Sequence, residues 1–216
     1  FCFVNIKEKY MRYNELTFQG RNAVLEAFRS GKTIDKLFIL DGCQDGPIKS
    51  IVREAKKTDA IINYVDKERL DRLAGTGHHQ GVVAIGAAYE YAEVEDILAA
   101  AKEKGEDPFI FILDEIEDPH NLGAIIRTAN LAGAHGVIIP KRRAVGLTAT
   151  VAKTSAGAIN YTPVAKVTNI SQTIEELKKQ GLWFVCADMG GETMYNLNLK
   201  GPIGLVIGNE GNGVSR

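Results

Sequence analysis

The chain of 216 residues has little cysteine, no marked excess of either charge and no long apolar run. Its three cysteines, Cys2, Cys43 and Cys186, are widely spaced and odd in number. That pattern argues against a disulfide framework and against a metal site with cysteine ligands, and free thiols fit a reducing cytoplasm. No apolar stretch is long enough to span a bilayer. We therefore expect a cytoplasmic protein with no metal and no membrane partner.

A lysine is missing from the glycine-rich stretch GNEGNGVS at residues 208–215. In a phosphate-binding P-loop, lysine and then serine or threonine follow the second glycine, whereas Val214 and Ser215 follow Gly213 here. Glu210 lies in the middle of the stretch, and its carboxylate would repel phosphate and attract cations such as a sulfonium or an arginine. The stretch is either a ligand loop at the carboxyl end of a parallel strand or a plain turn.

The first part of the chain alternates between helical and strand patterns. Strands are expected at residues 36–40, 61–65 and 81–86, and helices at residues 20–31, from Pro47 to about residue 58, and from residue 66 to Gly75. These segments predict a small α/β domain at residues 11–88. Residues 1–10 are expected to be an extension ahead of Met11. A charged helix at residues 94–104, followed by Gly105 and Pro108, is expected to lie in a linker at residues 89–106.

The rest of the chain predicts a second, larger α/β domain at residues 107–216. Apolar runs at residues 109–113, 136–140, 182–188 and 203–208 are typical of parallel strands covered on both faces. Helical patterns at residues 122–134 and 170–180 lie between them. This alternation indicates a doubly wound, Rossmann-like parallel sheet.

The loop and helix after the strand at residues 109–113 carry the most informative pattern. An acidic loop at residues 114–118 precedes Asn121, which we expect to cap the helix. The core face is expected to hold residues 122, 125, 126, 129 and 132. Gly123 and Arg127 lie one turn apart on the other face, where Gly123 would leave the surface bare ahead of Arg127. Arg127 is either a functional cation at the sheet edge or a solvated side chain.

Two groups of mainly basic residues could hold the phosphates of a nucleic acid. Lys141, Arg142 and Arg143 follow the strand at residues 136–140, and Lys153 comes later. The second group is expected on the first helix of the small domain and holds Arg21, Asn22, Arg29 and Lys32. Because the net charge is only −1, any affinity for nucleic acid has to come from such local groups. A solvated loop is the alternative for the first group.

The four histidines do not supply an evident catalytic base. His78 and His79 lie in a glycine-rich loop, where contact with a nucleic acid and simple solvation are both open. His120 neighbours the expected site, and His135 is expected to be structural.

Two motifs resemble one family of enzymes. DEIEDPHNLGAIIRTANLAGAHGVI at residues 114–138, together with LVIGNEGNGVS at residues 205–215, resembles the SpoU (TrmH-type) family of RNA ribose 2'-O-methyltransferases. KTSAGAINYTPV and HHQGVVAI are similar to the RlmB-like branch, which methylates guanosine in 23S rRNA. The resemblance covers the chain from about residue 13 to its end. It implies an L30e-like substrate-binding domain ahead of a catalytic domain of the trefoil-knot (SPOUT) class, a homodimer formed through the catalytic domain, and S-adenosylmethionine as cofactor.

The resemblance also implies roles for single residues. Asn121, Arg127 and Glu210 would be catalytic. The cofactor would contact residues of two strand ends, namely Gly208, Asn209, Gly211, Ala187 and Asp188. Because arginine is a poor base, we expect Arg127 to hold the target phosphate and stabilise the developing oxyanion.

The family's third motif, with an I-P-M segment and an S-L-N segment, is absent from this sequence. The catalytic domain is therefore expected to lack the last strand and C-terminal helix through which the family's knot is made. That absence keeps open a non-catalytic RNA-binding or ribosome-assembly module. A tRNA 2'-O-methyltransferase is a second alternative, because the sequence does not fix the target RNA. A nucleotide hydrolase is disfavoured because the P-loop lysine is missing.

Overall fold

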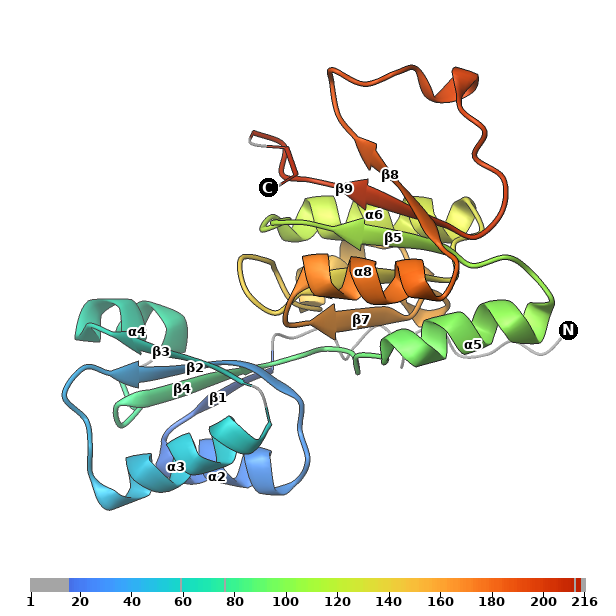
Figure 1. Cartoon of the computed structure of the whole chain (residues 1–216). Helices are drawn as coiled ribbons and strands as arrows, with labels where there is room; N and C mark the ends of the chain where they lie inside the picture. Colours follow the sequence, from blue (N-terminus) through green and yellow to red (C-terminus); the bar gives the residue numbers. More distant parts are fainter. Residues whose placement is uncertain (1–15, 59, 76, 212, 215–216) are drawn as a thin grey trace, which may run out of the picture. The chain divides into compact units, whose positions relative to one another are not determined.

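The computed structural model describes residues 16–214 except residues 59, 76 and 212, and it divides them into two compact units (Figure 1). The first unit holds residues 16–90 with residues 146–149, and the second holds the remaining described residues. Cys2, Ser215 and the expected extension ahead of Met11 lie outside the described residues.

The first unit is a four-stranded mixed sheet with helices on both faces. The strand order is β1-β4-β2-β3; β2 and β3 are parallel, and β4 runs antiparallel to both of its neighbours. Its elements are β1 (Leu16–Gln19), α2 (Arg21–Arg29), β2 (Ile34–Leu40), α3 (Gly46–Lys57), β3 (Ile61–Val65), α4 (Lys67–Ala74) and β4 (Val82–Gly86). The expected helices and strands are confirmed, whereas β1 was not predicted.

Side chains that alternate along the strands of the first sheet pack into two separate cores. Leu37, Ile39 and Val82 pack with the buried faces of α2 and α3, and Phe38 and Val83 pack with α4 on the other face. Asp45 and Asp66 cap α3 and α4, since each side chain accepts a hydrogen bond from a backbone N–H in the first turn. Each of these two helices therefore begins directly after an aspartate that caps it.

The second unit is built on a five-stranded sheet in which every pairing is parallel, as predicted. The order is β7-β6-β5-β9-β8. Its elements are α5 (Val94–Lys104), β5 (Phe109–Leu113), α6 (Pro119–Leu131), β6 (Gly136–Pro140), α7 (Ala149–Thr154), η1 (Ala158–Asn160), β7 (Val164–Val167), α8 (Ile170–Lys179), β8 (Trp183–Ala187), η2 (Met194–Asn196) and β9 (Ile203–Ile207). The short strand β7 and the helix α7 were not predicted.

Helix α5, which was expected in the linker, packs on the second sheet. Ile97 is fully buried in one cluster with Ile110 and Ile138. It also lies against Gly136, where an added Cβ would come within 2.6 Å of the Ile97 side chain. The chain passes from the first unit to the second at residues 90–91, so α5 belongs to the second unit. The expected domain limits themselves stay a prediction.

Helix α6 begins earlier than predicted, and Asn121 does not cap it. Pro119 occupies the first turn, and the Asp118 side chain accepts a hydrogen bond from the backbone N–H of His120 at 2.6 Å. Proline is favoured at this position because its φ is already helical and it has no N–H to satisfy. Asn121 therefore lies inside the first turn with an exposed side chain.

The expected faces of α6 also need two corrections. Gly123 is buried and does not lie on a bare surface, because Thr154 of α7 packs over it so closely that an added Cβ would overlap the Thr154 hydroxyl. Ala132 is exposed and not part of the core, because the helix ends at Leu131.

None of the helices formed by the described residues is long and apolar enough to cross a membrane. Within the same described residues, no group of three or more histidine, cysteine or acidic side chains could hold a metal ion.

Candidate active site

The carboxyl ends of β5, β9 and β8 lie side by side at one edge of the second sheet. Leu113 pairs with Ile207, which pairs in turn with Ala187. The residues that follow these strands are therefore neighbours, and the backbone N–H of Asp114 donates to the carbonyl of Ile207 at 2.8 Å. Figure 1 shows the loop after β9 leaving the sheet at this edge. The structure thus brings together the start of the loop after β9 and the acidic loop at residues 114–118.

The loop after β9 is closed by its own hydrogen bonds. Asn209 and Gly213 exchange two backbone hydrogen bonds of 2.9 Å, and the Asn209 side-chain oxygen accepts from the N–H of Gly211 at 2.8 Å. Gly208 cannot carry a side chain here, because a Cβ would overlap the backbone of Gly213 and Val214. Glu210, at the tip of the loop, is exposed.

Glu115 ties three loops together. Its carbonyl accepts a hydrogen bond from the side-chain amide of Asn209 at 3.0 Å, and its carboxylate pairs with Arg143 at 2.6 Å. Glu115 and Arg143 both have a positive φ, 57° and 55°, which is unusual outside glycine. The loops after β5, β6 and β9 are thereby fixed to one another. The sequence marked Glu115 only as part of an acidic loop.

The catalytic candidates of α6 lie on the helix that begins at this edge. Asn121 is exposed in the first turn and Arg127 is exposed in the third, about 9 Å further along the axis at 1.5 Å per residue. Arg127 shares its face with Gly123, which lies against Thr154, and with Leu131. Among the described residues no hydrogen bond or ion pair joins Arg127 to Glu210.

The end of β8 contributes negative charge to the edge. Burial, and then the nearby charges of Asp188 and Asp114, raise the pKa of the Cys186 thiol. Ala187 and Asp188 are exposed. An edge with these carboxylates is electrostatically suited to a cationic ligand.

The predicted RNA contacts differ in how they are held. Arg142 and Lys153 are exposed, and Lys141 is half-buried. Arg143 is paired with Glu115, and Arg21, in the first unit, is paired with Asp45 at 2.5 Å. Two of the six predicted contacts therefore have their charge offset by a carboxylate, which the sequence did not indicate.

Two of the histidines are structural. His135 is buried, as expected; its Nδ1 accepts from the N–H of Phe109 at 3.0 Å, and its Nε2 faces Glu106 at 3.0 Å. His79 is buried as well and bonds to Asp71 and to the N–H of Gly81. The interpretation of His79 as a solvated side chain is therefore wrong. His120 is exposed in the first turn of α6.

Both units match known families. The model described as SpoU rRNA Methylase family matches residues 108–216, and the model described as RNA 2'-O ribose methyltransferase substrate binding matches residues 19–92. The chain is 52% identical over 198 residues to YacO of Bacillus subtilis (strain 168), which is named a TrmH family tRNA/rRNA methyltransferase; the match covers 91% of this chain and 79% of YacO. A protein from Staphylococcus haemolyticus (strain JCSC1435), also named a TrmH family tRNA/rRNA methyltransferase, is 46% identical over 203 residues; the match covers 94% of this chain and 81% of that protein.

Solved structures show the same fold. The SpoU methyltransferase AviRb from Streptomyces viridochromogenes, in complex with AdoMet, aligns with a TM-score of 0.53 at 20% identity and covers 97% of this chain and 78% of AviRb. An rRNA methyltransferase from Sinorhizobium meliloti aligns with a TM-score of 0.50 at 23% identity, covering 99% and 82%. With the two family matches and the relatives at about half identity, the chain belongs to the SpoU (TrmH-type) family of S-adenosylmethionine-dependent RNA 2'-O-methyltransferases.

Proposed function

We propose that this protein methylates the ribose 2'-hydroxyl of a guanosine in 23S rRNA, and that the edge formed by β5, β8 and β9 is its active site. The observation that carries the proposal is the closed loop at residues 208–213, which Asn209 ties to Glu115 while Glu210 stays exposed. This edge is where parallel α/β sheets bind ligands.

The loop fits S-adenosylmethionine. The absence of a side chain at Gly208 keeps the backbone of two loop segments in close contact, and Asn209 and Gly211 hold the loop's shape through the bond between them. Ala187 and Asp188 are exposed at the neighbouring strand end. These five residues would hold the cofactor. When bound, S-adenosylmethionine supplies an electrophilic methyl group on a positively charged sulfonium, a charge that the carboxylates of this edge favour.

The 2'-hydroxyl is weakly acidic, so the protein has to align it and stabilise the alkoxide that develops. Arg127 is assigned to the target phosphate and to the developing negative charge, because a guanidinium is always protonated and forms paired hydrogen bonds with oxyanions. Asn121 and Glu210 are assigned to orienting Arg127 and the ribose. These roles require the RNA to bridge from the third turn of α6 to the loop after β9.

Contact with RNA is assigned to Lys141, Arg142, Arg143 and Lys153 in the second unit, and to Arg21 and Asn22 in the first. The target is expected in an exposed loop of the RNA, because an A-form duplex hides its base edges. Location in the cytoplasm follows from such a substrate.

A homodimer is assigned to the face of α6 that carries Arg127. Leu131 of α6 and Tyr161, next to η1, are each 80% exposed, and Asn130 of α6 accepts a hydrogen bond from Thr162 at 3.2 Å. Large apolar side chains gathered in this way are typical of an interface.

The test is methylation of deproteinised 23S rRNA and of tRNA with labelled S-adenosylmethionine, followed by mapping of the modified nucleotide. We expect label on one 23S guanosine. Arg127→Ala should lose at least 100-fold of the rate, which is within the effect of removing one group that stabilises transition-state charge.

The matched control is Lys179→Ala, which removes an exposed charge at the last residue of α8. Because β8 follows α8, Lys179 lies toward the amino ends of the strands, away from the site. Label on tRNA alone would assign the substrate to tRNA, and an unlabelled RNA with normal cofactor binding would favour a non-catalytic module.

A further inference from the structure

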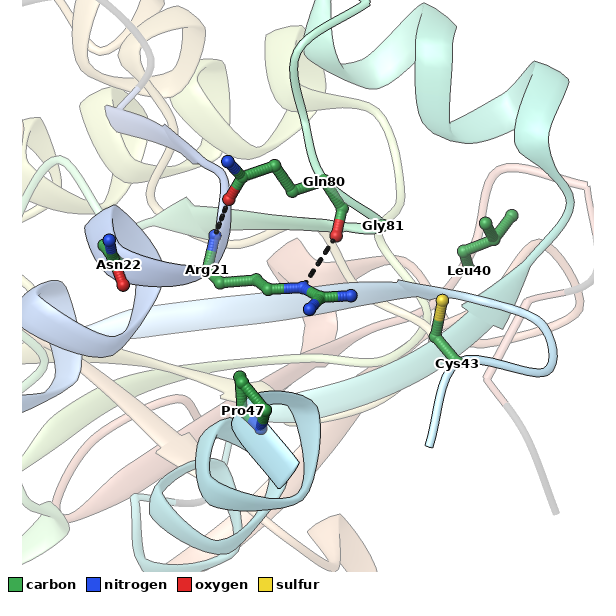
Figure 2. A pocket seen from close by; sticks show the side chains of 7 residues that line it. All are labelled: Arg21, Asn22, Leu40, Cys43, Pro47, Gln80 and Gly81. Carbon is green, nitrogen blue, oxygen red and sulfur yellow. Dashed lines mark hydrogen bonds between the residues drawn. The ribbon is translucent and has the colours of Figure 1, made fainter. Parts of the chain in front are cut away.

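The first unit contains a pocket of about 560 Å³, well within the size range of small-ligand sites. It lies between the start of α2, the loop from β2 to α3, and the turn before β4 (Figure 2). It is lined by Arg21, Asn22, Leu40, Cys43, Pro47, Gln80 and Gly81. Its size and its position among three segments make it a candidate binding site.

The guanidinium of Arg21 is held by hydrogen bonds from its in-plane N–H groups. Its Nε donates to the carbonyl of Gln80 at 3.2 Å, and Nη2 pairs with Asp45 at 2.5 Å. Its backbone N–H donates to the Gln80 side chain at 3.1 Å. In Figure 2 the side chain extends across the pocket, with its guanidinium toward Cys43 and Leu40.

This clamping decides what Arg21 can bind. Asp45 and the Gln80 carbonyl occupy two of the five in-plane N–H donors of Arg21. The Asp45 carboxylate also offsets the positive charge, which weakens the attraction of Arg21 for a phosphate. The flat faces of the guanidinium take no part in these bonds. A clamped guanidinium is therefore suited to stacking against a planar ring.

The backbone around the pocket is fixed in advance. Gly20, Gln80 and Gly81 all have positive φ values, of 85°, 53° and 82°. The turn is tied down because Leu40 donates to the carbonyl of Gly81 at 2.9 Å, and Gly81 donates to the buried His79 at 3.0 Å. A non-glycine residue such as Gln80 persists in this region only when its surroundings enforce it, so the pocket needs little ordering when it binds.

The lining offers an apolar wall and polar edges. Leu40, Cys43 and Pro47 form the apolar part, while the amides of Asn22 and Gln80 can both donate and accept hydrogen bonds. A planar ring with a polar rim is the shape that such a lining fits, and unpaired RNA bases have it.

We propose that this pocket accepts one unpaired nucleobase of the RNA substrate, stacked on the Arg21 guanidinium. This inference rests on the proposed action on RNA. Arg21 thereby reads the position of a base and does not serve as a phosphate contact. The first unit would then fix the register of the RNA, while the chemistry occurs in the second unit.

The test measures binding of the whole chain to 23S rRNA hairpins with single-stranded loops, in which each loop nucleotide in turn is replaced by an abasic one. One position should weaken binding by about 5- to 150-fold, the range for losing one stacked base. In Arg21→Lys, which keeps the charge but loses the plane, intact RNA should bind with a similar loss, and the abasic replacement should cost nothing more. Arg53→Lys, on α3 of the same unit and with a side chain that is 73% exposed, is the matched control and should behave as the wild type does.

A second readout does not depend on a variant. Cys43 lines the pocket as a free thiol, so intact RNA should slow its alkylation and the critical abasic RNA should not. If the abasic penalty is the same in Arg21→Lys as in the wild type, or if both RNAs protect Cys43 equally, the pocket assignment is wrong while RNA binding stands. If no hairpin binds the wild-type chain, the proposed function and the pocket assignment fall together.

Discussion

Replacing Gly123 with alanine tests how closely α6 packs against α7. In an exposed helix interior, alanine is more favourable than glycine by about 1 kcal/mol. At Gly123, however, the new Cβ would overlap the Thr154 hydroxyl, lie 2.8 Å from the Thr154 Cβ and 3.0 Å from the backbone nitrogen of Ser155. Overpacking of this kind costs about 1–3 kcal/mol. Because part of the clash is with backbone, we take the upper part of that range, about 2–3 kcal/mol. After the gain of about 1 kcal/mol in helix propensity is subtracted, we expect Gly123→Ala to lower the free energy of unfolding by about 1–2 kcal/mol.

The measurement is denaturant unfolding followed by tryptophan fluorescence. Trp183 is the only tryptophan of the chain and lies in β8, so its signal reports the second unit. Ala124→Gly is the control, because Ala124 is exposed on the same helix and should lose about 1 kcal/mol from propensity alone. A stability gain of about 1 kcal/mol in Gly123→Ala would refute the close packing.

A double-variant cycle isolates the contact. The Thr154 hydroxyl donates within its own helix to Thr150 at 2.9 Å and lies 3.3 Å from the carbonyl of Pro119. Thr154→Ala removes the atom that overlaps most, so the double variant Gly123→Ala/Thr154→Ala should be more stable than the sum of the single effects by about 1 kcal/mol. Strict additivity would show that the two residues do not press on each other.

Two further predictions concern the edge of the second sheet. Gly208→Ala should abolish detectable heat of S-adenosylmethionine binding in isothermal titration while leaving the Trp183 unfolding transition within about 1 kcal/mol, because the clash is confined to the loop; normal binding heat would contradict the tight loop. Asp188→Asn should speed alkylation of Cys186 at pH 8, since removing a negative charge lowers the raised pKa of the thiol and increases its thiolate fraction. An unchanged alkylation rate would mean that Asp188 does not act on Cys186.

The layers of both units could be predicted from the sequence because apolar periodicity reports burial directly. The four long apolar runs of the second unit became β5, β6, β8 and β9 of one parallel sheet. The strands that were missed, β1 and β7, are only four residues long, too short for a periodic pattern. Helix α5 was expected in the linker because its exposed face is highly charged, although Ile97 and Ala101 bury the opposite face.

Local chemistry was harder to predict where a residue had more than one possible role. Asn121 and Asp118 are both good capping residues, and Pro119 decides between them because it must lie in the first turn. Gly123 was expected to be bare surface, since a helical pattern does not show that α7 returns over it. Such errors concern contacts between elements, which a periodic pattern does not contain.

The positive charge available to RNA was also hard to predict from the sequence, because it depends on which basic side chains are paired with carboxylates from other loops. Arg21 and Asp45 are separated by 24 residues, and Arg143 and Glu115 by 28. These pairs form because loops after different strands converge, and Glu115 and Arg143 reach each other through positive φ values that their residue types do not favour. A count of basic residues therefore overestimates the positive charge that RNA can meet. Each phosphate that the protein neutralises adds about 0.7–0.9 to the slope of log affinity against log salt concentration. Because Arg21 and Arg143 are paired with carboxylates, we expect a measured slope smaller than the five predicted cationic contacts would give.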